Sequence, residues 1–285
     1  MLPGDLLTVV GNVGDDDVLY GTHVSPDLDT VVYTLAGIEG PRGWGVAGDT
    51  FAVMDRLAEL SVDTTFRLGD RDVATCLFRS TELAAGEPLS AVTTSIARAL
   101  DVATPVLPAT DDPVRTKILT GDGTWLDFQD YFVNRGHRDR VVAVRYDGVD
   151  RASPGPGVLR AIDGAALVVI APSNPHLSIH PILAIPGIRE AVAAKPRVVA
   201  VSPLFGGKAL KGPADRVMRD LGLPPGSDGV VAAYDGLLTD LVVDTGDAGE
   251  LGGLPPSITG HATGTTMRTV DEGRRFARWF AEVFR

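Results

Sequence analysis

The chain has 285 residues, of which 44% are hydrophobic and 22% are charged, so it is long enough for one large globular domain or two small ones. Its 37 acidic and 26 basic residues give a formal net charge of -11, which argues against a general binding surface for nucleic acid or an anionic membrane. An anionic small ligand could still bind in a local basic pocket. The single cysteine, Cys76, permits neither an intrachain disulfide nor a two-thiolate zinc site, and the absence of an export signal or a membrane-length apolar run favours a cytoplasmic protein.

The first predicted unit is a strand, a loop and a helix. Residues 6–10 are a β-branched apolar run that ends in Gly-Asn-Val-Gly and three aspartates, which is typical of a buried strand that opens into a loop. Ser25 could cap the following helix, with Pro26 at its first position and both Asp27 and Asp29 in its positively polarised first turn. Loops at such strand ends hold ligands in parallel sheets.

Two further helices and a β-rich insertion are predicted next. Asp49 could cap a helix whose apolar residues recur every three positions from Phe51 to Leu60, and the polar turn at 67–72 leads to another helix. Short extended runs separated by turn residues follow at 104–107, 116–120, 125–128 and 141–146. We interpret these runs as a small antiparallel insertion at about 103–150.

The second half of the chain alternates strands and helices, as chains that form a parallel sheet do. The predicted strands are at 167–170, 198–201 and 241–243. The predicted helices are at 182–194, 213–221 and 268–284. The sequence therefore predicts a single α/β domain over 1–285, a Rossmann-like three-layer α/β/α fold with a mostly parallel sheet and the inserted, partly β subdomain.

Asp27 and Asp29, together with the acidic run at 15–17, form the densest cluster of carboxylates in the sequence. Oxygen ligands of this kind suit Mg2+, which proteins usually hold through one or two carboxylates and the phosphates of a substrate. Acids in a first helical turn are also common because they interact favourably with the helix dipole. The spacing alone leaves a metal or catalytic site and a simple helix cap as alternatives.

Three other segments could contribute to a binding site. Arg71, in a polar turn, could make a forked contact to a carboxylate, phosphate or carbonyl group, or a plain surface ion pair. Ser173 and Asn174 follow a predicted parallel strand, which places them at the ligand-binding edge of the sheet. The glycine-rich loop at 206–212 carries two lysines that could meet phosphate, although it lacks the ending of a P-loop.

The other reactive side chains give weaker signals. His176 and His180 are four residues apart, but prolines bracket them and no acidic third ligand is adjacent, which disfavours a zinc site. No Gly-x-Ser-x-Gly elbow supports serine hydrolysis, and Cys76 falls in an apolar helical pattern typical of a core.

Seven short motifs occur in a fixed order along nearly the whole chain. They are Asn-Val-Gly-Asp-Asp at 12–16, Ser-Pro-Asp-Leu-Asp-Thr at 25–30, Gly-Asp-Arg-Asp at 69–72, Thr-Asp-Asp-Pro-Val at 110–114, Asp-Phe-Gln at 127–129, Pro-Ser-Asn-Pro at 172–175 and Lys-Gly-Pro-Ala at 211–214. Each is weak alone, but together they closely resemble the 2-phospho-L-lactate transferase family, which includes the phosphoenolpyruvate transferases of the coenzyme F420 pathway.

The resemblance implies a transferase that acts on the deazaflavin alcohol 7,8-didemethyl-8-hydroxy-5-deazariboflavin, called Fo. The ribityl hydroxyl of Fo would attack a guanosine diphosphate ester of phospholactate or enolpyruvate, release GMP and form a phosphodiester. The family places the deazaflavin near the second aspartate of its Ser-Pro-Asp-Leu-Asp-Thr motif and the arginine of its Gly-Asp-Arg-Asp motif, which correspond to Asp29 and Arg71.

Joining an alcohol to a pyrophosphate requires neutralised phosphate charge, an in-line pose and a base for the hydroxyl proton. We expect Mg2+ as the cofactor, with Asp27 and Asp29 as its candidate ligands and as candidate catalytic residues. Our hypothesis is that Asp27 holds the metal and that Asp29 orients or deprotonates the hydroxyl. The predicted nucleotide-binding residues are Asn12, Ser173, Asn174 and Ser178. A homodimer is expected, and neither a nucleic acid nor a membrane is expected as a partner.

The sequence departs from the family pattern at two places. The family usually opens with a strand and a glycine-rich nucleotide loop ahead of the segment that matches residues 6–10, and this sequence begins after that point. His180 stands where the family commonly has glycine, beside the expected nucleotide loop, where its ring could narrow the pocket.

Two other functions remain open. The gluconeogenesis-factor proteins share the fold and bind nucleotide sugars in a regulatory role, although the segments around Asp29 and Arg71 favour the transferase. A nicotinamide-dependent oxidoreductase fits the Gly-x-Gly-x-x-Gly spacing at 43–48, but Gly-Pro-Arg precedes it where a strand is required. The choice between phospholactate and phosphoenolpyruvate as the transferred acid also stays open.

Overall fold

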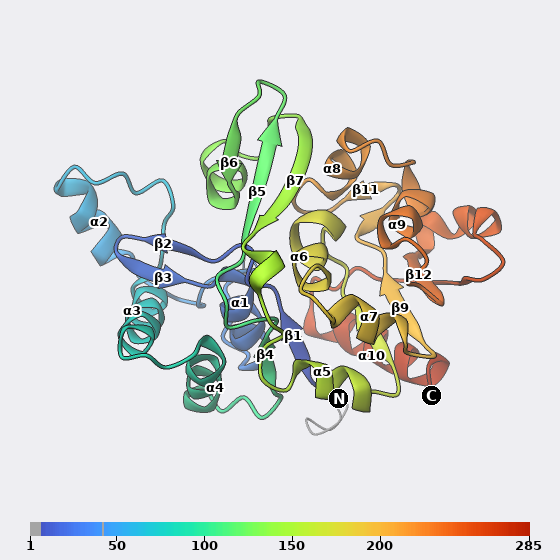
Figure 1. The fold of residues 1–285 in the computed structure, drawn as a ribbon, viewed down its shortest axis with the longest axis horizontal. Coiled ribbons are helices and arrows are strands. Elements are labelled where there is room, and N and C mark those ends of the chain that lie inside the picture. The colour runs from blue at the N-terminus through green and yellow to red at the C-terminus, as the bar shows by residue number, and fades with distance from the viewer. Residues whose placement is uncertain (1–6, 42) are drawn as a thin grey trace.

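The structure of the chain is a computed structural model that describes residues 7–41 and 43–285 (Figure 1). Its strands are β1 (Val9–Gly11), β2 (Asp17–Leu19), β3 (Thr22–Val24), β4 (Val106–Pro108), β5 (Arg115–Thr120), β6 (Trp125–Asp127), β7 (Val141–Asp147), β8 (Val168–Ile170), β9 (Val198–Val201), β10 (Leu204–Phe205), β11 (Lys208–Ala209), β12 (Asp240–Asp244) and β13 (Thr259–Thr263). Its α-helices are α1 (Pro26–Leu35), α2 (Ala52–Glu59), α3 (Asp70–Ala84), α4 (Leu89–Ala99), α5 (Val158–Gly164), α6 (His180–Leu183), α7 (Ile188–Ala193), α8 (Ala214–Asp220), α9 (Gly226–Tyr234) and α10 (Val270–Val283). Shorter helical turns are η2 (Asp130–Asn134), η3 (Val149–Arg151), η4 (Pro175–Ile179) and η5 (Thr245–Gly253).

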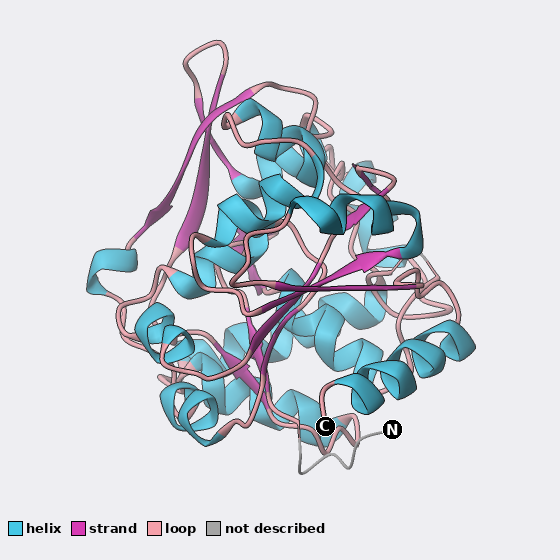
Figure 2. Ribbon diagram, turned by 90° about the vertical axis from the view of Figure 1, so that its right-hand side faces the viewer, coloured by secondary structure: helices cyan, strands magenta, loops and turns pink. Residues whose placement is uncertain are grey.

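The parallel strands of the described chain form two sheets, with helices on both sides of them (Figure 2). β1 pairs in parallel with β4, and a four-stranded parallel sheet has the order β13-β12-β9-β8. All four residues of β9 are buried, as expected for a central strand that is covered on both faces. The predicted α/β fold with a mostly parallel sheet is confirmed. Residue 6, the first of the predicted opening strand, lies outside the described residues.

One hydrophobic core cluster of the described residues joins the two parallel sheets to helices around them. Its buried members include Leu28 of α1, Val106 of β4, Ile170 of β8, Val198 of β9 and Leu241 of β12. The closing helix α10 packs aromatic side chains against the other face of β9 and β12. A capping box between Thr269 and Glu272 satisfies backbone donors at the start of α10, which fixes where the helix begins. The predicted amphipathic helix at 268–284 is therefore confirmed.

An antiparallel sheet in the order β6-β5-β7 projects from the parallel layer (Figure 1). It lies inside the stretch that we predicted as a β-rich insertion. The assignment of 104–107 to that insertion is wrong, because β4 continues the parallel layer beside β1, from Val9 opposite Val106 to Gly11 opposite Pro108. Three apolar residues between turns do not reveal their partner strand, so only the tertiary pairing distinguishes the two cases.

Asp49 and Asp70 cap helices in a crossed arrangement. We predicted that Asp49 caps α2, but its carboxylate accepts hydrogen bonds from the backbone N–H of Arg71 at 3.0 Å, in the first turn of α3. The carboxylate of Asp70 accepts instead from the N–H groups of Ala52 and Val53, at 3.0 and 2.9 Å, at the start of α2. This exchange ties the two helix N-termini together and fixes where α3 begins.

The helix that we predicted at 182–194 is divided into α6 and α7. Pro186 lies between them and cannot donate a helical hydrogen bond, which explains the break. Within the described residues, no helix is long and apolar enough to span a membrane.

Candidate active site

The loop after β1 is built around the Asn12 side chain. Its Oδ1 accepts a hydrogen bond from the N–H of Gly14 at 2.7 Å, and its Nδ2 donates to Oδ2 of Asp27 at 2.9 Å. A Cβ atom on Gly14 would lie 2.5 Å from Oγ1 of Thr116 and 2.9 Å from Cβ of Pro181, so only glycine fits there. The loop is thus held between the projecting sheet and α6, and Asn12 links it to the first turn of α1.

Three carboxylates converge at this loop. Asp15 and Asp16 are buried, and Asp27 reaches the same place from α1. Burial and the neighbouring Asp27 hold the pKa of Asp15 well above its ordinary value. Burial also raises the pKa of Asp27 to about 6, although the hydrogen bond from Asn12 lowers it. These groups are like charges in a low-dielectric environment, which is unfavourable until a cation or a proton joins them.

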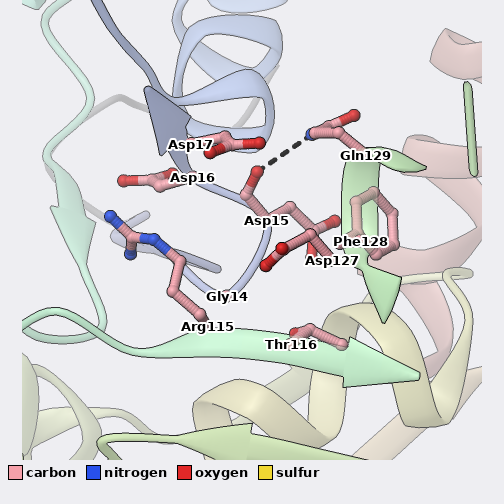
Figure 3. A pocket seen from close by; sticks show the side chains of 9 residues that line it. All are labelled: Gly14, Asp15, Asp16, Asp17, Arg115, Thr116, Asp127, Phe128 and Gln129. Atoms are coloured by element: carbon pink, nitrogen blue, oxygen red, sulfur yellow. Dashed lines mark hydrogen bonds between the residues drawn. The ribbon is translucent and has the colours of Figure 1, made fainter. Parts of the chain in front are cut away.

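A small cavity lies beside these carboxylates (Figure 3). It has a volume of about 10 Å³, close to the room that a single water molecule needs. Its lining residues are Gly14, Asp15, Asp16, Asp17, Arg115, Thr116, Asp127, Phe128 and Gln129. The Gln129 side chain donates a hydrogen bond to the carbonyl of Asp15 at 2.9 Å, which is the dashed line in Figure 3 and fixes the backbone of the acidic run.

The donor set at this cavity fits Mg2+ in its chemistry. Oδ1 of Asp15 and Oδ1 of Asp16 are buried and have no hydrogen-bond partner among the described residues. In that same part of the chain, no group of three or more His, Cys, Asp and Glu side chains is arranged as a complete metal site. Mg2+ usually takes only one or two carboxylates and completes its shell with water and substrate phosphates, so the two unpartnered oxygen atoms are the donors that such an ion would use.

Asp29 lies behind this cluster, in a buried ion pair with Arg79 of α3. The Arg79 side chain is 1% exposed, and its Nη1 also donates to the carbonyl of His23 at 3.2 Å. Burial raises the pKa of Asp29 to about 6, although Arg79 acts in the opposite direction. The roles predicted for Asp29 in metal and deazaflavin binding stay predictions, and its observed contact is with Arg79.

Arg79 belongs to none of the sequence motifs, so its place in the site was not predicted. Arg79 lies three residues after the buried Cys76 on α3, and an arginine on a buried helix face is the signal that could have found it. Nor were the partners predicted for Asp16, whose Oδ2 accepts from Oγ of Ser25 at 2.9 Å and contacts Nε2 of His23 at 3.0 Å. Ser25 was predicted to cap α1, but its hydroxyl bonds to Asp16 instead.

Arg71 lies in the first turn of α3, where its side chain is exposed. Its Nη1 donates to the carbonyl of Ala47 at 3.5 Å, a long contact that leaves most of the guanidinium fork for a ligand. The next residue, Asp72, accepts a hydrogen bond from the hydroxyl of Tyr33 on α1 at 2.9 Å. The structure thereby places Arg71 beside the helix that carries Asp27 and Asp29.

The predicted nucleotide loop after β8 is ordered by Asn174. Its Oδ1 accepts from the N–H groups of His176 and Leu177, at 3.1 and 3.2 Å, and its carbonyl accepts from the N–H of Ser178 at 2.9 Å. Nδ2 of Asn174 and Nε2 of His176 are buried and without a hydrogen-bond partner in the described part of the chain. Because polar atoms of this kind are normally satisfied, they are candidates for contact with a ligand.

His176 and His180 lie against each other, with ring centroids 4.7 Å apart at an interplanar angle of 72°. Burial and the neighbouring His180 lower the pKa of His176 to about 4, so its ring is neutral near pH 7. Nε2 of His180 contacts the carbonyl of Ala233 at 2.8 Å, which occupies that nitrogen. This geometry gives no support to a metal site between the two histidines.

The glycine-rich loop at 206–212 belongs to the hairpin of β10 and β11. The buried carboxylate of Asp247 accepts from the N–H groups of Gly206 and Gly207, at 3.0 and 2.9 Å. These two backbone donors are therefore occupied by an internal acid and are not presented to a phosphate group. The loop after β1 instead approaches α6, which follows the nucleotide loop, since a Cβ on Gly14 would lie 2.9 Å from Cβ of Pro181.

Comparisons with known proteins agree with the motifs. Residues 4–251 match the family described as 2-phospho-L-lactate transferase CofD. The chain is 45% identical over 250 residues to the phosphoenolpyruvate transferase of Thermobifida fusca, covering 85% of this chain and 77% of the relative. It is 39% identical over 248 residues to the 2-phospho-L-lactate transferase of Methanosarcina mazei, covering 87% and 81%. The crystal structure of protein BH3568 from Bacillus halodurans has a similar fold, with a TM-score of 0.64, 16% identity and coverage of 96% and 91%.

Proposed function

Because the chain belongs to the 2-phospho-L-lactate transferase CofD family, a family of transferases in coenzyme F420 biosynthesis, we propose that it joins a phosphorylated three-carbon acid to the deazaflavin Fo. The ribityl hydroxyl oxygen forms a bond to the phosphorus that carries the acid. The bond from that phosphorus to the bridging oxygen breaks, GMP leaves, and the hydroxyl proton passes to a base. The product is a phosphodiester of Fo with lactate or enolpyruvate.

One observation carries this proposal, namely the convergence of Asp15, Asp16 and Asp27 at the end of β1. Two of their oxygen atoms are buried and lack a hydrogen-bond partner among the described residues. Mg2+ bound there would neutralise phosphate charge, and one or two of the carboxylates of Asp15, Asp16 and Asp27 would hold it together with the phosphates of the substrate. Asn12, Ser25 and His23 satisfy other oxygen atoms of the cluster, so these two unpartnered atoms are the ones left for a ligand.

Asp27 is the carboxylate that we assign to direct contact with the metal or the reacting hydroxyl. Its pKa of about 6 keeps it ionised at neutral pH yet basic enough to accept a proton. Asp29 acts as a positioning residue, because Arg79 holds its carboxylate away from solvent. Arg71 offers an exposed guanidinium to the deazaflavin, and the free donor groups near Asn174 and His176 serve the nucleotide. Homodimer formation and a cytoplasmic location stay predictions.

The test is an incubation of the purified protein with Fo, Mg2+ and the guanosine diphosphate ester of either phospholactate or enolpyruvate. Both donors are tried separately, because the chain is similar both to a phosphoenolpyruvate transferase and to a 2-phospho-L-lactate transferase. Mass spectrometry of the deazaflavin and chromatography of the nucleotide measure the two products. We expect an adduct and an equal amount of GMP with one donor, and loss of both with Asp27→Asn. Asp150→Asn, at an exposed carboxylate outside the site, is the matched control and should keep full activity. A protein that forms neither adduct nor GMP with either donor contradicts the proposal, and tight binding of a nucleotide sugar without binding of Fo would then favour the regulatory function.

A further inference from the structure

An exposed tryptophan, Trp44, lies on the turn that follows α1. The backbone of this turn, residues 38–41 and 43–47, is closed by hydrogen bonds from Gly40 N to Gly45 O at 2.8 Å and from Ala47 N to Ile38 O at 2.7 Å. Gly43 and Gly45 have positive φ angles of 87° and 68°, which suit glycine and allow the tight path. Trp44 stands between them and is 53% exposed. The described backbone of the turn therefore presents a largely exposed aromatic ring.

The turn lies against the first turn of α3, where Arg71 is. Its Ala47 carbonyl accepts the 3.5 Å hydrogen bond from Arg71, and a Cβ on Gly45 would lie 3.9 Å from Oδ2 of Asp72. From the other side, Nζ of Lys211 lies 5.7 Å from the centroid of the Trp44 ring. The turn that carries Trp44 therefore contacts two segments that are far apart in the sequence and that both carry family motifs.

The shape of the acceptor matches this placement. Asp27 is in the first turn of α1, and the turn that carries Trp44 follows the other end of this ten-residue helix, which is about 15 Å long. A deazaflavin is elongated, with a planar fused ring at one end and a polyhydroxyl chain at the other. Its reacting hydroxyl can lie near Asp27 while its ring lies further along α1, beside Arg71. A planar aromatic ring there meets the flat face of an exposed tryptophan.

We propose that Trp44 stacks on the ring of the deazaflavin acceptor and positions its ribityl hydroxyl for transfer. This inference rests on the function proposed above and adds a residue that determines acceptor affinity. Stacking on an aromatic face is tolerant of ring substituents, whereas the guanidinium of Arg71 recognises the carbonyl edge. The two residues together account for selection of a flat, hydrogen-bonding heterocycle. The donor nucleotide is proposed to bind near Asn174 and His176, so removal of the Trp44 ring should leave donor binding unchanged.

The experiment compares Trp44→Ala and Trp44→Phe with a matched control, Trp125→Ala. Trp125 is also exposed, at 39%, and also has a cation near its ring, with Cζ of Arg145 at 4.1 Å, but it lies on β6 of the projecting sheet. The dissociation constant of Fo is measured without donor, from the fluorescence anisotropy of Fo itself. The KM values for Fo and for the donor are measured separately, and thermal melting checks that each variant is folded.

We expect Trp44→Ala to weaken Fo binding about 10- to 100-fold, as loss of an aromatic stacking partner does. Trp44→Phe should retain most of the affinity, the donor KM should stay within about twofold, and Trp125→Ala should match the parent. Unchanged Fo affinity in a folded Trp44→Ala variant overturns the inference while leaving the transferase proposal intact. If the parent protein itself binds no Fo and forms no adduct, both the proposed function and this inference are wrong.

Discussion

Replacing Asp27 by asparagine should stabilise the protein at neutral pH while it removes activity. Burial raises the pKa of Asp27 to about 6 from an ordinary value of 3.8. The folded state therefore binds this proton more tightly than the unfolded chain, and the stability that protonation gives is lost as the pH rises from 3.8 to about 6. With about 1.36 kcal/mol for each pKa unit, the ionised carboxylate destabilises the fold by about 3 kcal/mol at pH 8.

Asparagine keeps the size of the side chain and the oxygen that accepts from Asn12, but it carries no charge. The free energy of unfolding of Asp27→Asn should therefore exceed that of the parent by about 3 kcal/mol at pH 8, by roughly half that at pH 5 and by almost nothing well below pH 4. Guanidinium chloride titrations at the three pH values measure these differences. Asp150→Asn removes an exposed carboxylate and should change stability by less than about 0.5 kcal/mol.

The same variant should lose at least about 100-fold in kcat/KM, because a positioned acid–base group or metal ligand contributes that much or more. Functional residues often lower stability, so a gain in stability that accompanies loss of activity is the pattern of a site residue. The reasoning is wrong if Asp27→Asn is less stable than the parent at pH 8. It is also wrong if the gain in stability does not change with pH, because the effect would then not come from the carboxylate charge.

Three further predictions concern other contacts of the site. Arg79→Met should lower the free energy of unfolding by about 3–5 kcal/mol in urea titrations, because Asp29 would remain buried without its partner. A decrease of less than about 1 kcal/mol would contradict a buried ion pair. Arg71→Gln should raise the KM for Fo about tenfold or more with an unchanged melting temperature, since the side chain is exposed, and an unchanged KM would remove Arg71 from the acceptor site. Asp247→Ala should increase amide hydrogen exchange at Gly206 and Gly207, measured by mass spectrometry, and equal protection in both proteins would show that the carboxylate does not hold this hairpin.

The layers of the fold could be predicted because they depend on local patterns. The strands at 198–201 and 241–243 are buried on both faces, and their unbroken runs of apolar residues predict this. The crossed caps of Asp49 and Asp70 could not be predicted, because either aspartate satisfies the rule for a cap and only the packing of α2 against α3 decides which helix each one serves. For the same reason β4 was assigned to the wrong sheet, since its partner β1 is almost one hundred residues away.

The motif residues of the site could also be read from the sequence, and the structure brings Asn12 and Asp27 into direct contact. What the sequence could not show is how their surroundings differ. Asp27 and Asp29 are two residues apart, and in the sequence they are equivalent acids of one helical turn. Their environments are set by residues from distant segments, such as Arg79, whose position depends on how α3 packs beside β3.

The difference between the two aspartates follows from helix geometry. Residues two apart on a helix point about 200° away from each other, so the carboxylates of Asp27 and Asp29 leave α1 in different directions and meet different partners. One direction leads to the loop after β1, where Asp27 meets Asn12 and the like charges of Asp15 and Asp16. The other leads to α3, where Arg79 neutralises Asp29. A cation bound at Asp27 would therefore not compete with Arg79, whereas a ligand of Asp29 would have to share its carboxylate with Arg79.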